Sequence, residues 1–335
     1  MGMNRRRALA VLGSSTLIAA CGTRRQPRPV PTGSPAVPSA PPAATPAVPP
    51  APDTRTPEVA AASGPSPHLV VARGESPAAI TEAAVAALGG MGRFVLPGQN
   101  VIVKPNICVA YHGPEYAATT NPEVVATLVR LASEAGAARV RVMDYPFGGS
   151  AKDAYAISGI QAAVEAAGGE MELMARVKYE EVDFPAECRD IRRWVVYKDA
   201  LEADVIINVP IAKHHGIATL TLGAKNLMGL VENRNLIHVN LHQRVADLLA
   251  FFRPALTVMD AVRILTDHGP SGGNLDDVQQ MNTVIASHDP VAVDAYTTRF
   301  FPFADVDKVA YIRNAADMGL GSLDVEALEV QEMTV

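Results

Sequence analysis

Cysteine is scarce in this 335-residue chain, which contains three, and none of them stands in a C-x-x-C pair. A four-cysteine iron–sulfur cluster and a cysteine-based zinc site are therefore excluded, so no iron–sulfur cluster is expected. Any divalent metal would have to use histidine, carboxylate or carbonyl ligands. Cys108 and Cys188, which lie far from the N-terminal Cys21, form either a disulfide or two buried free thiols.

Signatures of several common enzyme classes are absent as well. The sequence has no G-x-S-x-G motif, no P-loop, and no G-x-G-x-x-G after its first expected strand. These absences argue against ordinary serine hydrolases, NTPases and classical dinucleotide-dependent dehydrogenases. The formal net charge is -6 and no Lys/Arg-rich face is apparent, so nucleic acid is not an expected partner.

The sequence also lacks long apolar runs. The apolar run near its start is short. The run from Ala8 to Ala20 has too few residues to cross a bilayer and follows Arg5-Arg6-Arg7. This pattern is typical of a signal peptide, which we expect over residues 1–21. The paired arginines with Leu9 resemble the twin-arginine export signal, although ordinary secretory leaders also begin with basic residues.

Residues 18–21 read Ile-Ala-Ala-Cys and resemble a lipobox, in which Cys21 is acylated and becomes the mature N-terminus. The alternative is a small-residue cleavage site beside an incidental thiol. Lipidation is favoured because Cys21 stands at the end of the apolar run. Two or three acyl chains would hold the protein stably at a membrane surface. We therefore expect an extracytoplasmic protein that is lipid-anchored to a bacterial membrane.

Composition divides the remaining chain into two parts. Residues 22–67 are mostly Pro, Ala, Ser and Thr. They are expected to form a disordered tether, because they contain too few large apolar side chains for a core. Residues 68–335 are long enough for one large domain or for two lobes with a substantial core.

Residues 68–335 alternate short runs rich in Val and Ile with longer Ala- and Leu-rich segments of helical period. This alternation predicts an α/β fold with a largely parallel sheet flanked by helices. Asn121-Pro122-Glu123 starts the best defined helix with an N-cap, a first-turn proline and an acid, and Gly136 ends it. Further helices are expected from Ser150 to before Gly168 and from Asp289-Pro290 toward Phe300, and strands at Leu69–Ala72, Val101–Lys104, Val140–Asp144, Val205–Val209, Leu256–Asp260 and Thr283–Ser287.

Polar side chains stand at the ends of most of these strands. Ligands bind beyond the carboxyl ends of the strands in an open parallel sheet, so we expect these side chains to meet at one site. Each alone can be explained as a turn or a helix cap, but lysine or histidine accompanies several of them. Candidate catalytic residues, as bases, acid–base partners or metal ligands, are Asp144, Lys213, His214 and Asp260. Candidate substrate-binding residues are Lys104, Asn106, Thr120, Lys225, Asn226 and Asp294.

Glycines flank the pair Lys225-Asn226. Gly223 and Gly229 permit tight backbone turns, so exposed main-chain amides there could present the two side chains to an anion. Lysine would neutralise a carboxylate or phosphate, and asparagine would orient it by hydrogen bonds.

His238 and His242 are the candidate metal ligands. They would share one face of a helix at i, i+4, or one face of a strand with Asn240, and two imidazoles so arranged could approach one metal. The alternative is helix-cap or solvent chemistry, because no H-E-x-x-H motif is present.

The chain also contains the segments Lys104-Pro105-Asn106, Thr119-Thr120-Asn121-Pro122-Glu123, Lys213-His214-His215, Gly223-Ala224-Lys225-Asn226 and Ser287-His288-Asp289-Pro290. As a set, these segments resemble the bacterial and archaeal domain-of-unknown-function family 362. The resemblance covers most of residues 68–300. Members often carry twin-arginine leaders, and some carry an iron–sulfur module that is missing here. The family pattern more often has His at position 121 and Thr-His at positions 214–215, so the resemblance does not imply a metal there.

The leading hypothesis is an exported, membrane-tethered enzyme that acts on an anionic small molecule by acid–base or metal-assisted chemistry. Lysines and carboxylates that converge in one cleft shift one another's pKa values, which suits proton transfer but also a static ion-pair network. One alternative is a non-catalytic lipoprotein that binds an anion or a metal. Another is a scaffold of the cell envelope, for which converging strand ends would have no use.

Export by the twin-arginine route gives a direct prediction. Replacing Arg5 and Arg6 together by Lys should block export, and Cys21→Ala should release the mature protein from membranes because the acyl chains are lost. Cell fractionation followed by immunoblotting measures both effects. Unchanged fractionation of both variants would contradict the interpretation of this leader.

Overall fold

The computed structural model describes residues 67–335. The signal peptide expected over residues 1–21, its lipidation site Cys21 and nearly all of the tether of residues 22–67 lie outside the described residues, so these stay predictions. Within residues 67–335, no helix has the length and apolar character that a membrane crossing requires.

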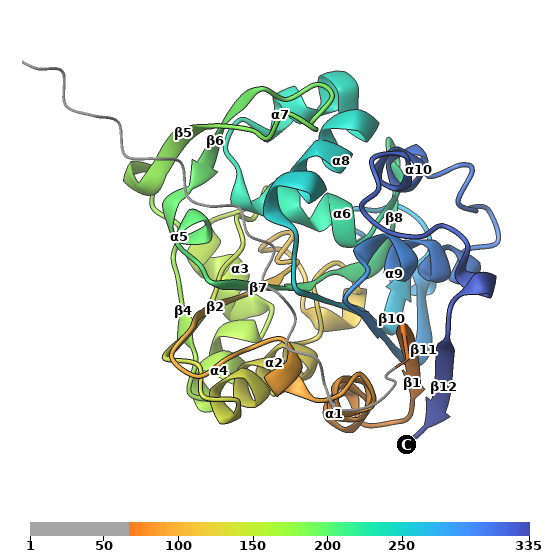
Figure 1. Ribbon diagram of the computed structural model, residues 1–335. Helices are drawn as coiled ribbons and strands as arrows, with labels where there is room; N and C mark the ends of the chain where they lie inside the picture. Colours follow the sequence, from red (N-terminus) through yellow and green to blue (C-terminus); the bar gives the residue numbers. More distant parts are fainter. Residues whose placement is uncertain (1–66) are drawn as a thin grey trace, which may run out of the picture. The chain divides into compact units, whose positions relative to one another are not determined.

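A mixed, mostly parallel sheet with helices on both faces forms the framework of the described residues, which confirms the predicted α/β fold (Figure 1). The strands are β1 (Leu69–Arg73), β2 (Asn100–Pro105), β3 (Arg139–Val142), β4 (Glu170–Met171), β5 (Tyr179–Asp183), β6 (Arg193–Tyr197), β7 (Val205–Val209), β8 (Ile211–His215), β9 (Thr219–Thr221), β10 (Leu256–Leu265), β11 (Val278–Ser287) and β12 (Val330–Thr334). The sheet order is β12-β1-β11-β10-β7-β2-β3-β4, β8 pairs with both β10 and β9, and β5 and β6 form a separate pair.

Alternation of side chains along the strands creates two apolar cores, one on each face of the sheet. Val101 and Val103 of β2 belong to one core, and Ile102 between them belongs to the other. Helices α1 to α4 cover the first face, and α6, α8, α9 and α10 cover the second (Figure 1). The α-helices are α1 (Pro77–Ala87), α2 (Pro122–Glu134), α3 (Ala151–Ile157), α4 (Ile160–Ala166), α5 (Lys198–Leu201), α6 (Gly223–Asn226), α7 (Arg234–Ile237), α8 (Leu241–Phe252), α9 (Pro290–Thr297) and α10 (Ala310–Asp317).

The predicted helix starts are confirmed. The Asn121 side chain accepts the backbone N–H of Glu123 at 2.8 Å, and α2 runs from Pro122 to Glu134. The helix expected after Ser150 is divided into α3 and α4, because Gly159 between them has a φ of 73°. Helix α9 begins after Asp289 as expected, and a 3-10 turn continues it to Phe300.

All six predicted strands are present, but β11 runs against the expected direction. It is antiparallel to both neighbours, with Ser287 at its carboxyl end opposite Thr257 near the amino end of β10. The following His288 and Asp289 therefore lie at the opposite edge of the sheet from the ends of β2 and β7. The expectation that all polar strand ends meet at one site is wrong for this strand.

Strand β8 extends the sheet beyond the end of β7. The two strands are separated only by Pro210, and both pair in parallel with the long β10. Strand β7 pairs with Leu256 and Thr257 of β10, and β8 pairs with β10 from Asp260 onward. This extension carries Lys213 past the carboxyl ends of the central strands.

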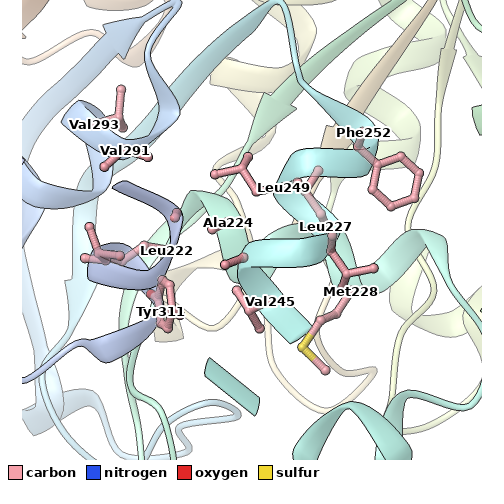
Figure 2. Packing of buried hydrophobic residues seen from close by; sticks show 14 of the residues in the cluster. Leu222, Ala224, Leu227, Met228, Val245, Leu249, Phe252, Val291, Val293 and Tyr311 are labelled. Carbon is pink, nitrogen blue, oxygen red and sulfur yellow. The ribbon is translucent and has the colours of Figure 1, made fainter. Parts of the chain in front are cut away.

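The short helix α6, which bears Lys225 and Asn226, is held from two sides. The Asp294 carboxylate of α9 accepts the backbone N–H groups of Gly223 at 2.6 Å and Ala224 at 2.9 Å. On the other side, Leu227 and Ala224 pack among the apolar residues of α8 (Figure 2). The first two amides of α6 are bound to Asp294, so the expectation of exposed main-chain amides at this turn is wrong.

A pH series tests the role of Asp294. Burial raises the pKa of Asp294 to about 7, although the two backbone N–H groups oppose the shift. A carboxyl whose folded pKa lies above its unfolded value of about 4 stabilises the fold at low pH and loses that contribution as the pH rises through about 7. Between these limits, the free energy of unfolding of the wild type should fall by up to ~1.4 kcal/mol per pH unit relative to Asp294→Asn.

Urea unfolding at several pH values measures this difference. The exposed Asp317→Asn serves as the control and should follow the wild type at every pH. A difference between Asp294→Asn and the wild type that stays constant from pH 4 to 7 would disprove the protonation of Asp294.

Candidate functional site

A pocket of about 890 Å³ lies at the carboxyl ends of β2, β3 and β8. The predicted site residues that line it are Lys104, Asn106, Asp144, Lys213, Lys225, Asn226 and His238. They come from distant parts of the chain, and the parallel arrangement of β2, β3 and β7 accounts for their meeting.

Lys104, near the end of β2, has no solvent-exposed surface. Its ammonium group donates to Asp144 Oδ1 at 2.7 Å, to Asn226 Oδ1 at 3.0 Å and to the carbonyl of Pro105 at 2.8 Å. All three N–H groups of the ammonium are thereby used. Burial lowers the pKa of Lys104, and the charge of Asp144 opposes that shift.

Asp144 is the counter-ion of Lys104, and its second oxygen is also engaged. Oδ2 accepts the backbone N–H of Ile107 at 2.6 Å. Gly229 packs directly over this ion pair, and a side chain at that position would collide with the Asp144 carboxylate. These contacts make Asp144 a structural partner of Lys104, whereas the sequence suggested a catalytic base.

Lys213 is a second saturated ammonium. Its Nζ donates to Asn106 Oδ1 at 3.0 Å, to the carbonyl of Ala118 at 2.6 Å and to that of Pro270 at 3.0 Å. Asn106 in turn donates to Asn226 Oδ1 at 3.0 Å, so one hydrogen-bonded network joins Lys213 to Lys104. All the partners of Lys213 within residues 67–335 are neutral oxygens, so its positive charge is not cancelled by direct contact.

Lys225 differs from both. Its side chain lines the pocket and is 9% exposed, yet it makes no hydrogen bond or ion pair with any residue of the described range. Burial, together with the charges of Lys213 and Arg234, lowers the pKa of Lys225 to about 7. Near neutral pH, a large share of the Lys225 amine is therefore uncharged.

His215 follows Lys213 by two residues on β8, so both side chains are on one face of the strand. Its Nδ1 accepts the backbone N–H groups of Ile217 and Ala218, both at 3.1 Å. Burial and the charges of Lys225 and Lys213 lower the pKa of His215 to about 3. The ring is thus neutral, and its proton is on Nε2.

Sequence reasoning missed several pocket residues. Arg234 donates to the carbonyl of Tyr145 at 2.6 Å and lies over its ring, and Arg176 lines the pocket from an exposed position. Thr221 is buried, and its hydroxyl has no hydrogen-bond partner in the described structure. Thr221 stands opposite Lys213 in the β8–β9 pairing, and the alternation Thr-Leu-Thr before Gly223 was the signal that could have indicated this strand.

His214 and Asp260, predicted as catalytic, are outside the pocket lining. Side chains alternate along a strand, so His214 is on the opposite face of β8 from Lys213, and its Nδ1 accepts the N–H of Gly269. Asp260 lies within β10, because that strand continues to Leu265. It shares the face of Val258 and accepts the backbone N–H of Asn121 at 2.7 Å.

Three other predicted residues lie outside the lining. Thr120 accepts the N–H of Asn106 and donates to Val209, so it fastens the loop after β2 to the end of β7. Asp294 holds α6, as described above. His242 is stacked on Tyr311, away from the pocket that His238 lines.

No metal centre emerges among residues 67–335, where no group of three or more His, Cys, Asp or Glu side chains could hold a metal ion. His238 and His242 therefore gain no third ligand of these types. Cys108 and Cys188 are both buried free thiols, so the disulfide alternative is wrong. The Cys108 thiol lines the pocket and donates to the carbonyl of Pro270.

These features define an α/β protein with a lysine- and arginine-rich pocket at the carboxyl ends of a mostly parallel sheet. The family model described as "Domain of unknown function (DUF362)" matches residues 101–299, and the chain belongs to this family.

A relative from Synechocystis sp., the thylakoid-associated protein sll1697, is 30% identical over 220 residues. The match covers 63% of this chain and 65% of that relative. Among solved structures, the lactate racemase apoprotein of Thermoanaerobacterium thermosaccharolyticum is similar with a TM-score of 0.40 and 13% identity. That match covers 66% of this chain and 54% of that one.

The contrast between the lysines predicts different stability effects. Lys104→Ala leaves the buried Asp144 carboxylate without its cation and should lower the free energy of unfolding by about 3–5 kcal/mol. Lys225→Met removes an amine that has no partner in the described structure and should change it by less than about 1 kcal/mol. Denaturant unfolding of both variants measures the difference. Equal destabilisation would show that Lys225 belongs to the structural network.

Proposed function

We propose that this is an exported, membrane-tethered protein whose pocket binds an anionic small molecule and acts on it as an enzyme by acid–base chemistry. The observation that carries the proposal is the charge balance of the pocket. Its carboxylates are Asp144 and Glu232, and Asp144 is already paired with Lys104. Its basic side chains are Lys104, Lys213, Lys225, Arg176 and Arg234.

Two unsatisfied groups support binding of a ligand oxygen. The buried Thr221 hydroxyl and the Lys225 amine both line the pocket, and neither has a hydrogen-bond partner in the described structure. Leaving the buried Thr221 hydroxyl unpaired costs about 1–3 kcal/mol, which a bound carboxylate or phosphate would recover. Tyr145, Phe147 and Tyr179 add aromatic surface beside these groups and would contact an uncharged part of the ligand.

The alternative is a tethered protein that binds an anion without a reaction. Lys104 and Lys213 favour binding without a reaction, because their N–H groups are all bound to protein oxygens. The Lys225 amine favours the enzyme, since its pKa of about 7 lets it exchange a proton near neutral pH.

Calorimetric titration with oxalate, pyruvate and inorganic phosphate tests the binding proposal. Arg234→Gln should weaken binding of the preferred anion at least about tenfold, because one unit of charge facing the ligand is lost. Raising the salt concentration should weaken binding as well.

Arg313→Gln is the matched control, since this exposed arginine of α10 pairs with Asp307 and is not part of the pocket lining. It should bind the anion as the wild type does. Absence of binding by the wild type to every anion tested, or equal losses in both variants, would refute the proposed anion site.

A further inference from the structure

The three buried lysines of the pocket differ in what their amines are free to do. Lys104 and Lys213 each donate three hydrogen bonds to protein oxygens, so their N–H groups are committed to the protein. Lys225 donates none within residues 67–335. A lysine becomes a nucleophile when it is desolvated beside other cations, because both effects favour the neutral amine.

The groups facing Lys225 supply this environment. Lys213 and His215 lie on β8, and Arg234 lies on α7. Lys213 and Arg234 disfavour a charged Lys225, and His215 is neutral. Cys108 also lines the pocket, and its thiol donates to the carbonyl of Pro270. Helix α6, held by Asp294 and by α8, fixes the backbone of Lys225 within this cluster.

We propose that Lys225 is the nucleophile of this pocket and forms an imine with the carbonyl group of a 2-oxo acid. The nitrogen lone pair attacks the carbonyl carbon, and a proton moves to the carbonyl oxygen to give a carbinolamine. Water then leaves and a C=N bond forms, so the step releases one water and needs no oxidant or reductant.

The substrate class follows from what surrounds the amine. This inference rests on the proposed function, because the carboxylate of a 2-oxo acid would be the anion that Arg234 and Arg176 bind. The carboxylate and carbonyl are adjacent in such a molecule, so anchoring the first would hold the second near Lys225. The Thr221 hydroxyl can donate to an oxygen of the bound acid.

Reductive trapping tests the inference on the purified full chain. The protein is treated with pyruvate and sodium borohydride near pH 7.5, and intact mass and peptide mapping locate any reduced pyruvyl adduct. Modification at Lys225 should exceed that of Lys308 at least about tenfold, because the Lys225 amine has its pKa lowered to about 7 and has no partner among residues 67–335, whereas the exposed Lys308 is paired with Asp305. Lys225→Arg should abolish the selective adduct, and Lys308→Arg should leave it unchanged.

Calorimetry with oxalate, which lacks a ketone, runs in parallel and separates the two proposals. Oxalate binding by the wild type without a selective adduct at Lys225 would overturn the imine and leave the anion site standing. An adduct of the same yield in Lys225→Arg would have to lie on another residue, and it would also overturn the imine at Lys225. Loss of both oxalate binding and adduct formation in the wild type would instead refute the proposed function.

Discussion

The buried ammonium of Lys104 is the constraint on which the arrangement of the pocket depends. A cation without solvent needs a partner for each N–H group, and Lys104 finds them in Asp144 after β3, in Asn226 of α6 and in the carbonyl of Pro105. Removing Asp144 would leave a buried charge unpaired, which costs far more than an exposed ion pair contributes. The ends of β2 and β3 and the helix α6 are therefore held together by one group, and the space beside that group is the pocket.

Part of this arrangement could be predicted from sequence, because it depends on local patterns. Runs of Val and Ile indicate buried strands, and Asn121-Pro122 indicates a capped helix, whatever the rest of the chain does. The polar residues at the ends of β2, β3 and β8 could likewise be assigned to one site from the rule for parallel sheets. That rule needs only the strand direction, which short connections and intervening helices suggest.

The rest depends on long-range pairing that composition does not reveal. The antiparallel direction of β11 moves His288 and Asp289 to the far edge of the sheet, and the extension of β10 past Asp260 turns that carboxylate toward α2. A shift of one residue along a strand reverses the face, which separates His214 from Lys213. Arg234 and Thr221 escaped prediction because they lie on very short elements, where no periodicity can be read.

The same network that fixes the pocket also decides which of its residues can react. Every donor of Lys104 and Lys213 is bound to a protein oxygen, so these lysines contribute positive charge that cannot move away. The charge of Lys213 acts on Lys225, whose own amine has no such partner in the described structure. A fixed cation beside an amine that has no partner attracts an anion. The same positive charge disfavours protonation of the amine and so favours its neutral form. The stability of the network and the reactivity of Lys225 therefore have one physical origin.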